Sequence, residues 1–364
     1  MTTVSQVYGS RKDDHVRLAV EQHHQRGAGV EVNQFDDVRF VHDALAGIAE
    51  SAVSLTTEVA GTDWAAPLYI NAMTGGSTRT GEVNRGLAIA ARQTGVPIAS
   101  GSMSAFLADP DLAPTYRVLR DENPDGFVVA NVNANATVDM AKRAVDLIAA
   151  DALQIHINTI QEIVMPEGDR DFSHWPSQIG KLAEALDVPV IVKEVGFGMT
   201  RSAVRRLADL GVTIADVSGR GGTNFATIEN ARRPHQDFAY LRDWGQSAPA
   251  CLIDDQAIAG QRGVTLLASG GVRQPLDVVR ALALGARAVG VSGYFLSVLE
   301  GEGVDALVST IADWIVQIRQ LMVVLGAPTV PDLVKTDVLV SGQVAEFARL
   351  RGIDPGDYAR RATP

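Results

Sequence analysis

A short polar segment directly behind an apolar run carries the clearest chemical signal. His156, Asn158, Gln161 and Glu162 follow the apolar residues 152–155. In an extended chain His156 and Asn158 project to the same side. Glu162 offers a hard oxygen ligand of the kind that Mg²⁺ takes together with substrate phosphates. The segment predicts a magnesium-assisted site, and a loop cap or an arginine pair is the alternative role for Glu162.

Two glycine-containing turns late in the chain predict a phosphate site. Gly271, Val272 and Arg273 follow one apolar run, and Ser292-Gly293 follows the next. Glycines let backbone N–H groups approach a ligand closely, and a helix N-terminus behind them favours an anion. Arg273 could add a charge-assisted contact.

Lys193 lies at the end of the apolar run 189–192. A buried ammonium is costly unless it meets a compensating group. The pyrimidine edge of a reduced flavin is one candidate partner, and Glu194 is the other, although it points to the opposite face of a continuing strand. Other turns after apolar runs are consistent with either a ligand or a simple turn: Asn71 to Gly76 with Thr74, Ser100 to Ser104, Asn131 to Asn135, and Ser218 to Thr223.

The N-terminal sequence Arg11-Lys12-Asp13-Asp14-His15 places three potential cations within five residues. Such charge runs usually form solvated faces. A mobile basic segment that closes over a diphosphate is the alternative.

The elements that must position these groups alternate between apolar runs and helical segments. Eight runs rich in Val, Ile and Leu are expected to be strands buried on both faces: 67–72, 96–100, 126–131, 152–158, 189–194, 213–218, 265–269 and 286–292. Helices are expected at 80–95, 111–123, 138–149, 178–186, 201–210, 255–263, 275–284 and 295–325, with Thr137 as an N-cap and Gly95, Gly211 and Gly285 as C-terminal stops.

This alternation predicts an α/β protein with a (β/α)8 TIM barrel, in which the site lies at the C-terminal ends of the strands. A doubly wound sheet is the rival, because alternation alone does not show closure. We expect one domain over residues 1–364: an N-terminal extension (1–60), the barrel (61–300) with an insertion at 219–254, and a C-terminal helical tail (301–364).

Composition narrows the class of protein. The chain has 364 residues, 46% of them hydrophobic, and a formal charge of −11, which disfavours a nucleic-acid binder. The single Cys251 excludes an intramolecular disulfide and fits a reducing cytoplasm. Without a signal peptide or a long uninterrupted apolar stretch, we expect a soluble cytoplasmic protein and no membrane span.

With these motifs in place, the chain resembles the type 2, FMN-dependent isopentenyl-diphosphate isomerase family almost from end to end. The resemblance lies in RKDDH (11–15), NAMTGG (71–76), SGSMS (100–104), NVNAN (131–135), QIHIN (154–158), QE (161–162), PEGDR (166–170), VKEVG (192–196), SGRGGT (218–223) and SGGVR (269–273). Many relatives carry Gln-Arg where this chain has Met103-Ser104, which removes one phosphate-binding arginine from the implied site.

The resemblance implies the role of each candidate residue. FMN would contact Ala72, Met73, Thr74, Ser102, Asn131, Lys193, Ser218 and Thr223, with its phosphate on Gly271, Val272, Arg273, Ser292 and Gly293. The diphosphate substrate would contact Arg11, Lys12, Ser102, Ser104, Asn158 and Gln161, and Glu162 would bind Mg²⁺. His156, Gln161 and Lys193 would assist catalysis.

The same resemblance implies the chemistry. Reduced FMN would act as the acid–base device that moves the double bond, with Lys193 opposite its anionic edge, and NADPH would only reduce the flavin. A homo-oligomer, either a tetramer or an octamer, is also implied.

Two other functions stay open at this stage. An FMN-dependent 2-hydroxy-acid oxidase or dehydrogenase would need a histidine base and an arginine pair, which His235 with Arg232 and Arg233 partly imitates. A non-catalytic module that binds flavin or phosphate is the second alternative.

Overall fold

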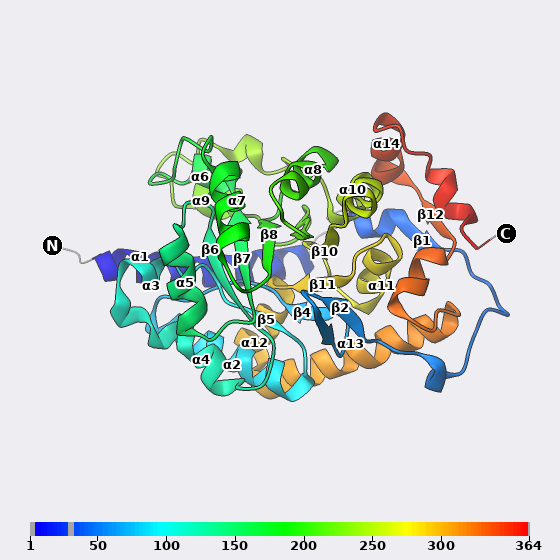
Figure 1. The fold of residues 1–364 in the computed structure, drawn as a ribbon, viewed down its shortest axis with the longest axis horizontal. Coiled ribbons are helices and arrows are strands. Elements are labelled where there is room, and N and C mark those ends of the chain that lie inside the picture. The colour runs from blue at the N-terminus through cyan, green and yellow to red at the C-terminus, as the bar shows by residue number, and fades with distance from the viewer. Residues whose placement is uncertain (1–3, 28–32, 363–364) are drawn as a thin grey trace.

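Eight parallel strands close into a barrel (Figure 1). The computed structural model describes residues 4–27 and 33–362, with side chains for 11–25 and 33–362. The barrel strands are β4 (Leu68–Ile70), β5 (Ile98–Ala99), β6 (Val128–Asn133), β7 (Ala152–Ile157), β8 (Val190–Glu194), β9 (Ile214–Asp216), β10 (Thr265–Ser269) and β11 (Ala288–Val291). Because β11 pairs with β4, with Val289 opposite Leu68, the sheet has no free edge. The predicted barrel is confirmed, and the doubly wound sheet is wrong.

Both faces of the strands are buried, as their apolar composition predicts. Inside the barrel, each strand contributes one residue to an apolar layer: Tyr69, Ala99, Val129, Ala152, Ile191, Ile214, Leu267 and Ala288. The hairpin of β2 (Thr57–Val59) and β3 (Thr62–Trp64) covers this layer from below, with the Trp64 ring centroid 5.5 Å from that of Tyr69. The bottom of the barrel is therefore a packed core, and room for a ligand lies only at the other end.

Helices cover the outside of the barrel. They are α2 (Thr78–Thr94), α4 (Pro114–Glu122), α5 (Val138–Leu147), α7 (Trp175–Ala185), α8 (Arg201–Asp209), α10 (Ala248–Arg262), α11 (Pro275–Ala283), α12 (Gly293–Glu302) and α13 (Val304–Val324). The predicted cap at Thr137 is present, since its side chain accepts a hydrogen bond from the Met140 N–H, 3.2 Å away. Gly95, Gly211 and Gly285 adopt positive φ as the predicted helix stops.

Two predicted helices have different bounds. Helix α10 begins at Ala248 rather than near residue 255, because Ser247 caps it and Pro249 fits its first turn. The long helix expected at 295–325 is two helices, because Gly303 takes φ +88° and breaks the run between α12 and α13.

Two short segments that are far apart in the sequence pair beside the barrel. The short strand β1 (Val38–Phe40) pairs antiparallel with β12 (Val338–Val340), and α14 (Gly342–Leu350) follows (Figure 1). The expected helical tail therefore contains a strand. The sequence could not reveal it, because its partner lies about 300 residues away and each strand has only three residues.

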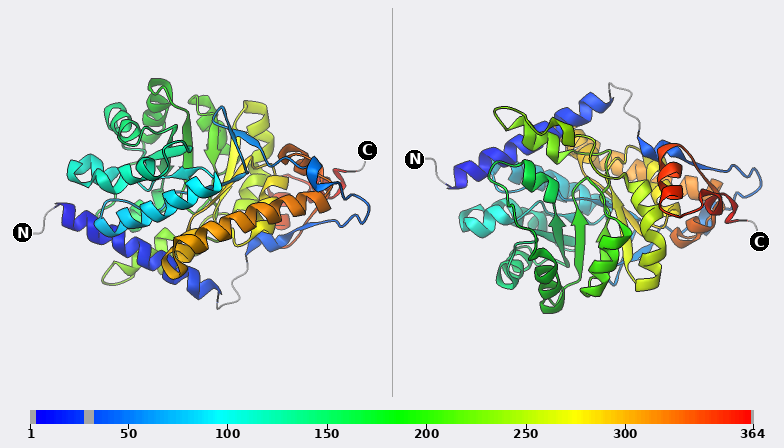
Figure 2. Two further views of the ribbon diagram at one scale, coloured as in Figure 1. Left: turned by 90° about the horizontal axis from the view of Figure 1, so that it is seen from below. Right: turned by 90° about the horizontal axis from the view of Figure 1, so that it is seen from above.

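The N-terminal segment forms a helix that the sequence analysis did not predict. Helix α1 (Val4–Gly27) lies along the barrel and contacts α12, α2 and α9 (Phe225–Ala231) (Figure 2). Its sequence has no strong apolar stripe, so tertiary contacts rather than periodicity determine its position.

Helix α13 is long and apolar enough to cross a membrane by length and composition alone. In the structure, Leu307, Ile311, Trp314, Ile318 and Met322 recur at helical spacing and are buried. The helix packs against α2 and α11 and forms part of the outer layer of the barrel (Figure 2). Packing against the barrel thus explains part of the apolar composition of this helix.

A buried carboxylate attaches the C-terminal elements to the barrel. Asp254 on α10 accepts hydrogen bonds from the Arg201 Nε at 2.7 Å and the Arg351 Nε at 2.9 Å. We predict that Asp254→Ala lowers the free energy of unfolding by about 1–3 kcal/mol, because the hydrogen bonds from Arg201 and Arg351 are lost. Urea denaturation measures this change.

The matched control is Asp209→Ala, which removes an exposed carboxylate paired with Arg262 at 2.6 Å. It should cost about 0.5 kcal/mol or less, since solvent screens exposed pairs. Equal losses in the two variants would contradict the anchoring role of Asp254.

Candidate functional site

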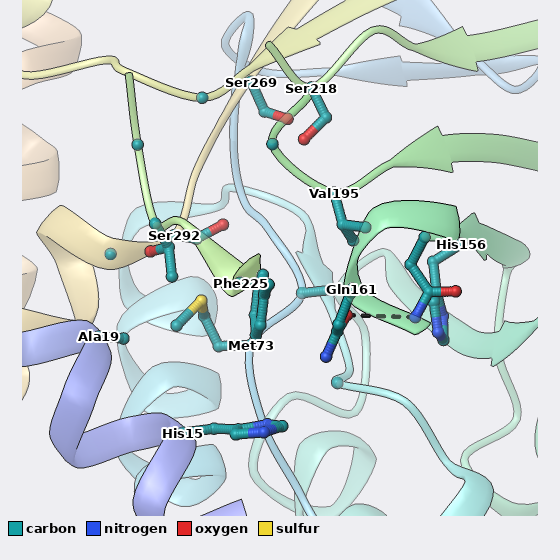
Figure 3. A pocket seen from close by; sticks show the side chains of 18 of the residues that line it. His15, Ala19, Met73, His156, Gln161, Val195, Ser218, Phe225, Ser269 and Ser292 are labelled. Atoms are coloured by element: carbon teal, nitrogen blue, oxygen red, sulfur yellow. Dashed lines mark hydrogen bonds between the residues drawn. The ribbon is translucent and has the colours of Figure 1, made fainter. Parts of the chain in front are cut away.

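A cavity of about 690 Å³ opens at the C-terminal ends of the barrel strands (Figure 3). This volume lies within the range of about 300–1,000 Å³ that is typical of cofactor and small-molecule sites. Nineteen of the predicted site residues line it: Arg11, Lys12, Ala72, Met73, Ser102, Ser104, Asn131, His156, Asn158, Gln161, Glu162, Lys193, Ser218, Thr223, Gly271, Val272, Arg273, Ser292 and Gly293. The fold thus brings together residues that are up to 282 positions apart in sequence, from Arg11 to Gly293.

Thr74 is the one predicted site residue that does not line the cavity. It is buried behind the wall, where its carbonyl accepts a hydrogen bond from the Gly101 N–H at 3.0 Å. A Cβ on Gly101 would lie 2.4 Å from the Thr74 backbone nitrogen. Thr74 therefore joins the loops after β4 and β5.

Backbone groups after β10 and β11 form one end of the cavity. Gly270 and Gly271 have φ of +88° and +79°, which favour glycine. A Cβ on Gly270 would lie 1.9 Å from the Gly219 carbonyl oxygen. The loops after β9 and β10 can therefore approach this closely only because residue 270 has no side chain. Ser292 and Gly293 begin α12, whose N-terminal N–H groups favour an anion. This end suits the phosphate of a bound cofactor.

The Arg273 guanidinium does not reach into this end as a free charge. It donates to Asp36 from Nη1 and Nη2 at 2.9 and 2.7 Å, and its Nε donates to Asp277 at 2.9 Å. The sequence analysis expected the Arg273 side chain to contact a phosphate, whereas in this structure it pairs with Asp36 and Asp277. Asn33 also donates to the Gly271 carbonyl at 2.7 Å, so the residues after α1 support the phosphate end from outside.

Lys193 is buried at the end of β8 and faces the cavity. Its Nζ donates to the Glu194 backbone carbonyl at 2.6 Å and to the Ser218 Oγ at 3.0 Å. Burial lowers its pKa, and the nearby Asp216 carboxylate opposes that shift. The Glu194 carboxylate instead accepts the Phe197 N–H at 2.6 Å, and burial raises its pKa to about 7. The ammonium therefore contacts the backbone of Glu194 and not its carboxylate.

His156 is a neutral side chain in this site. Its Nδ1 lies 2.8 Å from the Asn131 Oδ1. Burial, then the charges of Lys12 and Lys193, lower its pKa to about 3. At neutral pH the ring is uncharged, so His156 is not an imidazolium that could act as a general acid.

The basic N-terminal segment forms part of the cavity wall, so its interpretation as a solvated charge run is wrong. Lys12 and His15 are buried, and Figure 3 shows His15 and Ala19 of α1 on the side of the cavity. Burial and the neighbouring Arg11 lower the pKa of Lys12 to about 7, against the raising effect of Glu229. Arg11 lies 3.7 Å from Glu167 across the cavity mouth.

Glu229 on α9 is the main polar residue near the site that the sequence analysis missed. Its Oε1 lies 3.0 Å from the His15 Nε2 and accepts the Gln161 Nε2–H at 3.0 Å. Burial alone would raise the pKa of Glu229, but hydrogen bonds from His15 and Gln161 and the charge of Arg232 lower it to about 2. No pattern in the sequence pointed to Glu229, because it lies in the insertion 219–254 and follows no predicted strand.

Glu162 and Asn158 form the polar corner expected for a metal. Glu162 is buried, and its two oxygens accept N–H groups from the Asn158 side chain and the Asp169 backbone, each at 2.9 Å. The Asn158 Oδ1 is buried and has no hydrogen-bond partner in the structure. Across the described residues, no three His, Cys, Asp or Glu side chains form a metal cluster. A cation here would need oxygens from its ligand.

The residues expected of a hydroxy-acid oxidase do not form a site here. His235 is exposed, Arg232 pairs with Glu167 at 2.8 Å, and Arg233 pairs with Asp237 at 2.6 Å. None of the three side chains is among those that line the described cavity.

Known proteins resemble the chain at two levels. Residues 117–340 match the family model described as "FMN-dependent dehydrogenase". Among solved structures, a mandelate oxidase variant aligns with a TM-score of 0.62 at 16% identity, covering 92% of this chain and 96% of that one. A flavocytochrome b2 variant aligns with a TM-score of 0.63 at 20% identity, covering 91% and 81%. These distant structures support the fold.

Curated relatives are much more similar in sequence. Proteins named "Isopentenyl-diphosphate delta-isomerase" from Nocardia farcinica and Kitasatospora griseola are 59% and 61% identical over 353 residues, covering 97% of this chain and 96% and 95% of theirs. A relative with the same name from Latilactobacillus sakei is 46% identical, covering 95% of this chain and 97% of its own. On this evidence the chain belongs to the type 2, FMN-dependent isopentenyl-diphosphate delta-isomerase family.

Proposed function

We propose that this protein converts isopentenyl diphosphate to dimethylallyl diphosphate, using FMN, Mg²⁺ and NADPH as the reductant of the flavin. One observation carries the proposal: a single cavity joins a glycine-rich phosphate cradle, the buried Lys193 and the cationic side chains of α1. The high identity to relatives with this name supports the choice of substrate.

The residues present fit FMN. Its phosphate would bind Gly271, Val272, Ser292 and Gly293, where backbone N–H groups and the start of α12 favour an anion. The flavin ring would lie near Ala72, Met73, Ser102, Asn131, Lys193, Ser218 and Thr223. When bound and reduced by NADPH, FMN supplies the acid–base chemistry of its ring.

The reaction adds a proton at the terminal alkene carbon and removes one from the neighbouring methylene, so there is no net redox change. The residues of the chain hold and orient the substrate for these transfers. Arg11 and Lys12 meet the diphosphate from α1, and the hydroxyls of Ser102 and Ser104, 2.9 Å apart, meet it from the loop after β5. Lys193 would stabilise negative charge on the edge of a bound, reduced flavin.

Glu162 would hold Mg²⁺ together with oxygens of the diphosphate. The Asn158 Oδ1 supports this assignment. It is a buried acceptor beside the Glu162 carboxylate and has no hydrogen-bond partner among the described residues. His156, Asn158 and Gln161 then lie next to the bound substrate as hydrogen-bonding groups.

Apolar side chains form the wall where the hydrocarbon part would lie. Ala19, Met73, Val195 and Phe225 face the cavity in Figure 3. Such a wall excludes water from a cation-like transition state. Cytoplasmic localisation and assembly into a tetramer or octamer belong to the same proposal, and the exposed Val316 and Val324 of α13 are consistent with a contact between copies.

The test combines flavin binding with turnover. The purified protein should be yellow, or become yellow with FMN, and should convert isopentenyl diphosphate under reducing conditions with Mg²⁺ and NADPH. Oxidation of a 2-hydroxy acid by the FMN-loaded protein, without isomerisation, would instead favour the oxidase. Binding of FMN with neither activity would favour the non-catalytic module.

Replacing Glu162 by Gln should abolish most Mg²⁺-dependent turnover, because the shape stays but the charge opposite the cation is lost. FMN affinity, measured by fluorescence quenching, should stay unchanged. The exposed Glu184 on α7 provides the control substitution Glu184→Gln, which should keep full activity. Undiminished Mg²⁺-dependent turnover in Glu162→Gln would remove Glu162 from the proposed metal site.

Arg11→Ala and Lys12→Ala should each weaken diphosphate binding by about 1.5–3 kcal/mol, which is a rise of about 10- to 150-fold in KM. The flavin spectrum should not change. Arg17→Ala, on the same helix but paired at the surface with Asp14 and Glu21, should leave KM unaltered. An unaltered KM in both cavity variants would leave α1 without a role in substrate binding.

Lys193→Met should lower the midpoint potential of bound FMN by on the order of 30 mV, or about 1.4 kcal/mol, because the anionic reduced form loses its cation. The phosphate cradle remains, so FMN should still bind. Lys181→Met on the exposed face of α7 should leave the potential unchanged. A redox titration that finds the same potential in both variants would exclude Lys193 as the electrostatic partner of the flavin.

A further inference from the structure

A continuous chain of side-chain hydrogen bonds crosses the barrel just below the cavity. The His156 Nδ1 lies 2.8 Å from the Asn131 Oδ1, and the Asn131 Nδ2 donates to the Gln154 Oε1 at 2.7 Å. The Gln154 Nε2 donates to the Asn71 Oδ1 at 3.4 Å, and the Asn71 Nδ2 donates to the Asp216 Oδ2 at 2.9 Å. Asn131, Gln154, Asn71 and Asp216 are all buried, so solvent does not complete any of these bonds.

The far end of this chain can only accept hydrogen bonds. Asp216 is completely buried, and its carboxylate is surrounded by further donors: the Tyr69 hydroxyl at 2.7 Å, the Ser269 hydroxyl at 2.8 Å and the Ser218 N–H at 3.0 Å. The Asn71 NH₂ group and the Ser218 N–H can only donate, and each reaches one oxygen of the Asp216 carboxyl group, so both oxygens act as acceptors. Asp216 therefore defines the acceptor end of the chain.

The direction of every other link follows from this end. Asn71 must present its NH₂ group to Asp216, which leaves its carbonyl for Gln154. Gln154 must then present its carbonyl to Asn131, and Asn131 must present its carbonyl to His156. A carbonyl oxygen needs a donor, so the ring nitrogen that faces it, Nδ1, must carry the proton.

We propose that Asp216, acting through Asn71, Gln154 and Asn131, sets the tautomer of His156, so that Nδ1 carries the ring proton and Nε2 presents a lone pair to the cavity. Asp216 and Gln154 are positioning residues in this scheme. His156 is then a hydrogen-bond acceptor for a ligand and not a donor. The neutral state of the ring, noted above, agrees with one proton on one nitrogen.

The backbone carbonyl of Val132 competes for the same proton. It lies near the ring and raises the pKa of His156 slightly against the larger effect of burial. If the ring proton were on Nε2 instead of Nδ1, the Asn131 amide would have to turn over, and the order of donors and acceptors in the whole chain would break. The chain of amides favours Nδ1 because one buried carboxylate orients all of its members.

This inference deepens the proposed function, since it assigns the hydrogen-bonding role of a residue beside the substrate. It rests on contacts within the protein and can be tested without turnover. Failure of the isomerase assay would leave it standing, and an Nε2-protonated ring would refute it without refuting the proposed isomerase activity.

The experiment is ¹⁵N NMR of the FMN-loaded protein labelled in its histidine rings, at pH 7. Protonated and bare ring nitrogens have distinct shifts, and couplings to the ring carbon-bound protons distinguish Nδ1 from Nε2. The His156 signals are assigned by their loss in His156→Gln. We expect a single state protonated at Nδ1. A proton on Nε2 would overturn the proposal.

The variant Gln154→Met tests whether the chain of amides is the cause. Methionine has nearly the same length but neither donates nor accepts as the amide does, so Asn131 loses its fixed direction. We expect the Nε2-protonated form to appear. Asn71→Ala, which breaks the chain on the far side of Gln154, should have the same effect and serves if Gln154→Met does not fold.

Tyr69→Phe is the matched control. It removes one donor from Asp216 but leaves the link from Asn71 intact, so the tautomer should not change. If both Gln154→Met and Asn71→Ala kept the pure Nδ1-protonated state, Asp216 would not set the tautomer. A change in Tyr69→Phe as large as in the other two would indicate a general loss of packing instead.

Discussion

Closure of the barrel is the constraint on which the rest of the structure depends. Because the last strand, β11, pairs with the first, β4, the carboxyl ends of all eight strands meet in one ring. The apolar layer and the β2–β3 hairpin fill the other end. The polar residues that follow the strands therefore converge on a single chamber, although Thr74 lies behind its wall.

That chamber holds several buried charges, and each is stabilised by close partners. Lys193 donates to a carbonyl and a hydroxyl, Glu229 accepts from His15 and Gln161, and Asp216 accepts from four groups. Burying an unpaired charge would cost far more than these hydrogen bonds contribute. The overall charge of −11 thus says little about the cavity, where Arg11, Lys12 and Lys193 concentrate positive charge for an anionic ligand.

Segments outside the barrel complete the site. Helix α1 brings Lys12 and His15 to the mouth, and α9 in the insertion brings Glu229, which bonds both α1 and the segment after β7. The residues after α1 support the phosphate end through Asn33 and Asp36. Two segments whose positions the alternation of strands and helices did not predict thus line or support the chamber.

The sequence by itself determined the eight strands and most of the helices around them, because buried parallel strands are continuous apolar runs. It also indicated that polar residues at the strand ends would line a site, and the family resemblance assigned several further residues of the cavity wall. It also located the glycine turns, since positive φ and close backbone approach at Gly270 and Gly271 leave few other choices. Tertiary structure alone decided what these side chains contact. Arg273 pairs with Asp36 more than 200 residues away, and β1 pairs with β12 across a similar separation. Such partners have no periodicity along the chain, so only folding in three dimensions specifies them.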